Sequence, residues 1–151
     1  MMALAVALCL VSFFANVDAH AKLVLYSFEG KINQSEAIVI AKVVKIRKSL
    51  LGKYSASVQT VRVIKGDFKE KEFVIKYGQL FWYPKEDTTE LVENESYVLF
   101  LTPYKSCYRF VGADDGYYRI RDSRTVCHEQ KDFLLEDFIK TIKGIAPRLN
   151  K

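Results

Sequence analysis

The feature that most constrains the fold is a long stretch of β-branched residues over Glu36–Arg47. It reads Glu-Ala-Ile-Val-Ile-Ala-Lys-Val-Val-Lys-Ile-Arg, and this density of β-branched side chains favours an extended strand. The adjacent pair Val43-Val44 interrupts the alternation along the strand, which indicates a β-bulge or a strong bend. A long, bent first strand is typical of a sheet that curls into a small barrel.

Further segments with the same character follow along the chain. The expected strands are Tyr54–Lys65 with a second bulge near Gln59, Glu72–Tyr77, Ser96–Thr102, Cys107–Gly112, Tyr117–Arg121 and a short strand near Arg124–Cys127. Ser96–Thr102 is apolar at both parities, so we expect it at the centre of the sheet. Cys107–Gly112 and Tyr117–Arg121 flank a turn-forming tetrapeptide, and we expect them to pair as a hairpin.

Helical signals lie at the two ends of this strand-rich region. Ser27 is a plausible N-cap for one or two helical turns. Apolar residues recur at helical spacing over Lys131–Lys143, and Gly144 and Pro147 end that pattern. The expected fold is therefore mainly β, with five or more bent antiparallel strands in a small closed barrel, a short N-terminal helical turn and a C-terminal helix over residues 131–143.

Several of these segments resemble netrin-like domains, the family of barrels found in tissue inhibitors of metalloproteinases and in uncharacterised exported bacterial proteins. The matching segments are Ser35–Val43, Val61–Gly66, Asn94–Leu101 and Gly116–Ile120, together with Gly112. The resemblance implies a five- to six-stranded OB-like barrel in one domain over residues 22–147. It does not imply protease inhibition, because the inhibitors chelate zinc through an N-terminal cysteine and this chain has none near its expected mature start.

The first 19 residues predict export. Residues 1–19 form an apolar leader without lysine or arginine, and small residues precede possible cleavage points after Ala19 or Ala21. A membrane anchor is the alternative, but the segment lacks the flanking basic residues that would hold it in place. We therefore expect a secreted or periplasmic protein with no transmembrane segment in the mature chain.

Export also shapes the expectations for cysteine and charge. Cleavage would remove Cys9 and leave Cys107 and Cys127, which we expect to form a disulfide in an oxidising compartment. The chain has a net charge of +5, and a basic exported protein favours anionic partners. Its lysines are dispersed along the sequence, however, so an ordinary solvated surface is the simpler interpretation.

The best binding candidate in the sequence is the aromatic cluster Phe81, Trp82 and Tyr83, in a long irregular segment before the central strand. Aromatic residues in such a loop are typical of a surface that contacts a partner, although Phe81 and Trp82 could equally plug one end of the barrel. A metal hypothesis rests on His20, whose free α-amine and imidazole could chelate copper after cleavage behind Ala19.

The function expected from these patterns is that of an exported, non-enzymatic binding domain. Its expected partner is a protein or a cell-envelope component rather than nucleic acid, and no cofactor is expected. The alternative is an exported metal-handling protein that binds copper through the mature N-terminal His20.

Overall fold

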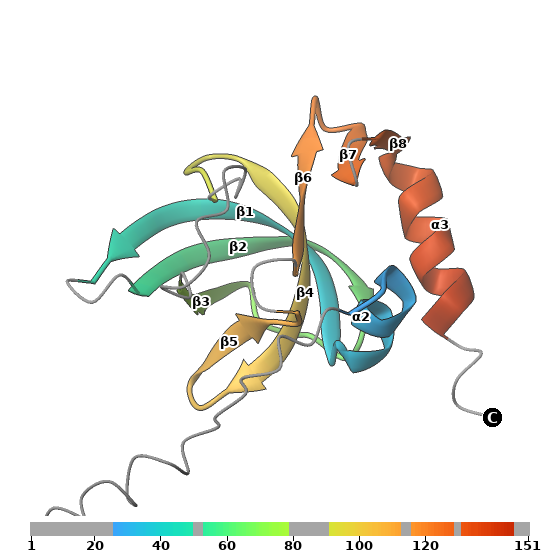
Figure 1. The fold of residues 1–151 in the computed structure, drawn as a ribbon. Helices are drawn as coiled ribbons and strands as arrows, with labels where there is room; N and C mark the ends of the chain where they lie inside the picture. Colours follow the sequence, from blue (N-terminus) through green and yellow to red (C-terminus); the bar gives the residue numbers. More distant parts are fainter. Residues whose placement is uncertain (1–25, 50–52, 79–90, 113–115, 129–130, 147–151) are drawn as a thin grey trace, which may run out of the picture.

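The computed structural model describes residues 26–49, 53–78, 91–112, 116–128 and 131–146, and it confirms a mainly β chain with a helix near each end of this region (Figure 1). The strands are β1 (Ala37–Lys48), β2 (Lys53–Lys65), β3 (Glu72–Gly78), β4 (Ser96–Tyr104), β5 (Cys107–Phe110), β6 (Tyr117–Arg121), β7 (Thr125–His128) and β8 (Lys131–Leu134). The helices are α2 (Phe28–Gln34) and α3 (Leu135–Ile145).

Five strands close an OB-like barrel. β1 pairs with β2 on one edge and with β4 on the other, β3 follows β2, and β5 pairs with β4. A parallel contact between Ile75 of β3 and Tyr108 of β5 completes the ring, and the other pairings are antiparallel. β6, β7 and β8 continue the sheet from β4 outside the barrel. The expected barrel is therefore confirmed, with additional strands beside it.

Bulges bend the two longest strands. Val43 lies opposite Val58 and Lys45 lies opposite Ser57, so Val44 is an extra residue in β1, as the sequence predicted. In β2 the register shifts at Val61, two residues from the predicted position near Gln59, and again at Ile64. Bulges increase local twist and bend the strand that carries them, and such bending suits a sheet that closes into a barrel.

The side chains of β1 and β4 divide the core into two parts. Alternate residues point into the barrel, where they pack with the inner faces of the other barrel strands: these include Val39, Ala41, Val43, Tyr97, Leu99 and Leu101. Their neighbours Ile38, Ile40, Val98 and Phe100 point outward and are buried beneath α2 and α3. β4 is thus buried on both faces, which confirms its predicted central position.

The expected hairpin between the fifth and sixth strands is wrong. β5 and β6 both pair with the same edge of β4, with Phe110 opposite Leu101 and Tyr117 opposite Leu99. Between them, the Phe100 carbonyl accepts a hydrogen bond from Val111 N at 2.9 Å, and Phe100 N donates to the Gly116 carbonyl at 2.8 Å. Two short strands therefore pair in succession with the same edge of the long, apolar β4, and the local turn signal does not determine the pairing.

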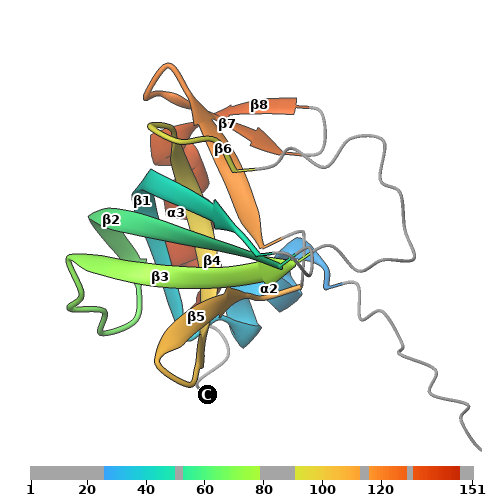
Figure 2. The same cartoon turned by 90° about the vertical axis from the view of Figure 1, so that its left-hand side faces the viewer.

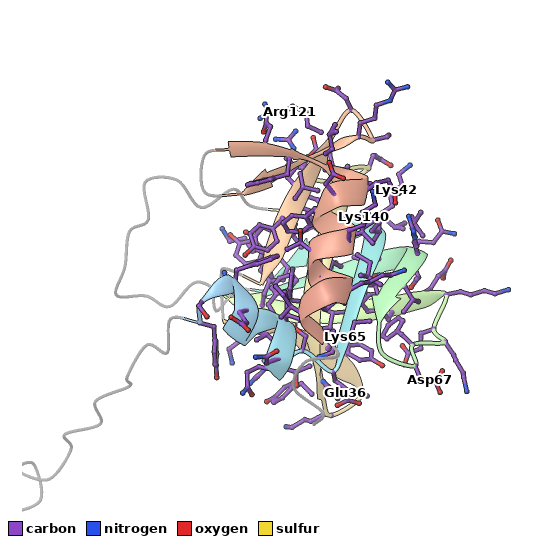
Figure 3. All side chains as sticks on the ribbon, turned by 90° about the vertical axis from the view of Figure 1, so that its right-hand side faces the viewer. Glu36, Lys42, Lys65, Asp67, Arg121 and Lys140 are labelled. Carbon is purple, nitrogen blue, oxygen red and sulfur yellow. The ribbon has the colours of Figure 1, made fainter. Side chains whose placement is uncertain are left out.

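The C-terminal helix begins later than the predicted range of 131–143. Residues Lys131–Leu134 form β8 and pair with β7, so α3 begins at Leu135 and ends at Ile145. Backbone pairing with a neighbouring strand overrides helical periodicity in this short segment. Figure 3 shows α3 lying across the barrel, and its buried residues Phe138, Ile139 and Ile142 supply the apolar side. At the other end, Ser27 caps α2 as expected, because its Oγ accepts a hydrogen bond from Gly30 N at 3.0 Å.

Candidate binding surface

Several residues singled out in the sequence lie outside the described part of the chain. These are the leader over residues 1–19, the metal candidate His20, and the aromatic cluster Phe81, Trp82 and Tyr83. Their proposed roles in export, copper binding and partner contact stay predictions.

The two cysteines are not brought together. Cys107 is a free, buried thiol whose Sγ lies 3.0 Å from the Tyr104 carbonyl oxygen. Cys127 lies in β7, which reaches β4 through β6 opposite Ser96, at the other end of β4 from Tyr104. At about 3.3 Å per strand residue, those two ends are about 26 Å apart. A disulfide requires Cα atoms within about 7 Å, so the expected Cys107–Cys127 bond is not formed in this structure.

What the fold does assemble is a set of basic side chains on the outer face of β1, β2 and β3. Cross-strand register gives three rows on this face: Lys42–Gln59–Glu72, Lys45–Ser57–Val74 and Arg47–Ser55–Lys76. Lys53 extends the face by one further position, opposite Gly78. We call Lys42, Lys45, Arg47, Lys53 and Lys76 the cationic face.

The bulge at Val44 creates this grouping. Side chains of a regular strand alternate between faces, so Lys45 and Arg47 would share the inward face of Val43 if Val44 were paired in an uninterrupted ladder. Because Val44 is extra, the inward position passes from Val43 to Ile46, which packs on the barrel core. Lys45 and Arg47 therefore emerge on the same outer face as Lys42.

The cationic face lacks the ion pairs found elsewhere on the surface. Salt bridges join Arg62 to Glu136 at 2.8 Å, Lys69 to Asp67 at 3.2 Å, Lys140 to Asp137 at 3.6 Å, Arg121 to Asp132 at 3.7 Å, and Arg119 to Glu95. Among the residues that the structure describes, the members of the cationic face form no ion pair, and all are exposed. Glu72 is the one acidic side chain in its three rows. The face therefore carries a local excess of positive charge.

Polar groups line the middle strand of this face. Ser55, Ser57 and Gln59 project from β2 beside the basic side chains of β1, and Ser55 also lies beside Lys76 of β3. None of the three side chains forms a hydrogen bond with another described residue. Val74, which is 38% exposed, is the apolar member of the rows. Hydroxyl and amide groups are thus available to a ligand that spans the basic residues.

The helices leave this part of the sheet open. They cover Ile38 and Ile40 at the start of β1 and Ile64 at the end of β2, whereas the cationic face occupies the opposite ends of these two strands. Figure 2 shows β1, β2 and β3 side by side, with α3 behind them. The barrel therefore separates a helix-covered half from an open, basic half.

Aromatic side chains fill the two ends of the barrel. At the end nearest Lys53, the rings of Tyr54 and Tyr77 stack with centroids 5.3 Å apart, and the Lys48 Nζ lies 5.3 Å from the Tyr54 centroid. Near the other end, Tyr108 donates a 2.7 Å hydrogen bond to Glu70 Oε1. This bond, together with burial and the negative charge of Glu70, raises the pKa of Tyr108 to about 12. These groups fix the ends of the strands that carry the cationic face.

Metal and membrane features are limited to what the described residues can show. Within them, no group of three or more His, Cys, Asp or Glu side chains is arranged to hold a metal ion. Neither helix of the described region is long and apolar enough to cross a membrane.

In comparisons with known proteins, no family model and no curated protein sequence matches this chain.

The sequence contained a signal for this face that charge counting misses. Its basic residues are dispersed among apolar ones, and β1 alone contributes Lys42, Lys45 and Arg47 at unequal spacing. The parity change at Val43-Val44 explains that spacing, because an extra residue restores the shared outward direction. The positions of the basic residues, taken together with the predicted bulge, place Lys42, Lys45 and Arg47 on one face of the strand.

Proposed function

We propose that this chain is an exported, non-enzymatic binding domain that contacts a protein or a cell-envelope component through its cationic face. The observation that carries the proposal is the gathering, on an open sheet surface, of exposed basic side chains that form no ion pair within the described part of the chain. Clusters of one charge raise the local concentration of oppositely charged partners and speed their association. The apolar leader over residues 1–19 supports export.

We also propose that the barrel is netrin-like. The OB-like strand order and the helices near both ends of the described region are compatible with the resemblance carried by Ser35–Val43 and Asn94–Leu101. A shared fold does not define a shared activity, so the proposed binding role depends on the surface and not on the family.

Binding to the envelope fraction of the source cell tests this function. The chain is expressed in full, purified after export, and compared with a Lys45→Gln/Arg47→Gln/Lys76→Gln variant by co-sedimentation. The control, Lys69→Gln/Lys140→Gln/Lys143→Gln, removes the same charge from other parts of the surface. We expect the control to sediment as the unmodified chain does, and the first variant to remain in solution.

Thermal unfolding must show that both variants retain the fold. Equal sedimentation of the unmodified chain and both variants would contradict a role for the cationic face. Failure of the unmodified chain to bind any envelope fraction would contradict the binding function itself.

A further inference from the structure

The spacing of the cationic face suits an extended ligand. Neighbouring outward positions on a strand are about 7 Å apart and adjacent strands are about 5 Å apart, so Arg47 and Lys76 lie across β2 with their Cα atoms about 10 Å apart. Lys42 and Lys53 extend the basic area in opposite directions from this pair. A chain laid along β2 would meet Lys42, Lys45 and Arg47 on the β1 side, and Lys76 on the β3 side at the end nearest Lys53.

The polar middle of the face indicates what that chain carries between its charges. Ser55, Ser57 and Gln59 offer hydroxyl and amide groups directly along β2. Each can donate and accept hydrogen bonds, and their side chains make none with other described residues. Such groups match the hydroxyls of a sugar backbone.

We propose that the cationic face binds an anionic polysaccharide, with its acidic groups on the basic side chains and its sugar hydroxyls on Ser55, Ser57 and Gln59. The inference rests on the proposed binding function and specifies the chemistry of its ligand. The basic residues supply most of the affinity and its salt dependence, and the polar residues of β2 supply selectivity for sugar.

Two other polyanions fit the face less well. Proteins that bind single-stranded nucleic acid without sequence preference stack bases on aromatic rings, and the three rows of this face contain none. A lipid surface would use the basic side chains and leave the polar residues between them without a role. Both remain outcomes of the test.

The test measures binding of the full, exported chain to dextran sulfate, with three comparison probes: polyglutamate, single-stranded oligothymidine, and phosphatidylcholine vesicles containing phosphatidylglycerol. One variant removes charge (Lys45→Gln/Arg47→Gln/Lys76→Gln), and another retains charge but removes two hydroxyls (Ser55→Ala/Ser57→Ala). The charge-matched control is Lys69→Gln/Lys140→Gln/Lys143→Gln.

We expect the unmodified chain to bind dextran sulfate more tightly than any comparison probe. The charge variant should bind it about tenfold more weakly, and the slope of log Kd against log salt concentration should fall by about two to three. The hydroxyl variant should lose affinity for dextran sulfate while its weaker binding to polyglutamate is unchanged. The control should retain the affinity of the unmodified chain.

Three results would overturn the proposal. Equal affinity for polyglutamate or for vesicles, with no effect of the hydroxyl variant, would show that charge alone is recognised. Preference for oligothymidine would identify a nucleic-acid surface. If the chain binds the envelope fraction through the cationic face but does not bind dextran sulfate, the polysaccharide inference fails while the proposed function survives. If the chain binds neither the envelope fraction nor dextran sulfate, the inference and the proposed function both fail.

Discussion

The lysine at the end of β2 provides a quantitative test of how the barrel holds its first helix. The Lys65 Nζ donates hydrogen bonds to the Ile32 carbonyl at 2.6 Å and to the Ser35 carbonyl at 2.7 Å. These acceptors lie at the C-terminal end of α2, where carbonyl groups lack helical partners and the helix dipole favours positive charge. Figure 3 shows Lys65 near one end of the barrel, close to Glu36.

Lys65→Met retains a long apolar side chain and removes the ammonium. A hydrogen bond to a charged group contributes about 1.5–3 kcal/mol. Lys65 is only partly buried, so water can replace some of the lost contact. Burial lowers the pKa of Lys65, because desolvation opposes its charge. The methionine variant carries no charge and therefore avoids this desolvation penalty. We therefore expect a net loss of about 2 kcal/mol in the free energy of unfolding, and a fall of about 6 °C in Tm.

The assay is urea unfolding followed by circular dichroism, with Lys69→Met as the matched control. Lys69 pairs with Asp67 at 3.2 Å, and both side chains are 82% exposed, so its replacement should cost less than about 0.5 kcal/mol. An unchanged m-value would show that the variants unfold from a similar fold. If Lys65→Met and Lys69→Met lose the same stability, the proposed helix–strand link is refuted.

Two further predictions concern other parts of the barrel. Gly116→Ala should lower the free energy of unfolding by about 2 kcal/mol or more, because a Cβ there would lie 2.5 Å from the Phe110 Cβ. A Cβ at Gly144 would have nothing within 4 Å, so Gly144→Ala should stabilise α3 by up to about 1 kcal/mol. Shifts of Tm in the same direction for both variants would contradict this. The pKa of Tyr108 is raised from 10.0 to about 12 by its bond to Glu70, so its stabilising contribution is complete below pH 10 and is lost as pH rises through about 12. Between those values the unmodified chain should lose more stability in urea titrations than Tyr108→Phe, and parallel losses would argue against the bond.

The sequence was most informative where apolar pattern and tertiary contact agree. Ser96–Thr102 is apolar at both parities, and β4 is buried on both faces because β1 and two shorter strands flank it. The bulge at Val43-Val44 was visible for a similar reason, since a parity change within a β-branched run has few other structural explanations. In these segments the local preference and the packed barrel require the same conformation.

The pairing partners were less accessible from local pattern. β5 ends at Phe110, before the turn signal that precedes Tyr117. That signal gives no information on whether the next strand returns to β5 or joins β4. That choice depends on the free edge of β4, where the backbone of Phe100 accepts a hydrogen bond from Val111 and donates one to Gly116. Likewise, Lys131–Leu134 forms β8 because it pairs with β7. The helical spacing of apolar residues in the sequence does not indicate that a strand lies beside this segment.

The bulge in β1 links fold to function more closely than composition does. An uninterrupted ladder would direct Lys45 and Arg47 toward the barrel core, where unpaired charges are strongly unfavourable. Because Val44 is accommodated as a bulge outside the ladder, both side chains lie on the surface and Ile46 takes the inward position. The bulge that bends the strand therefore also places Lys45 and Arg47 on the outer face that they share with Ser55 and Ser57. Barrel closure and the proposed recognition of an anionic polymer are, on this argument, consequences of one local irregularity.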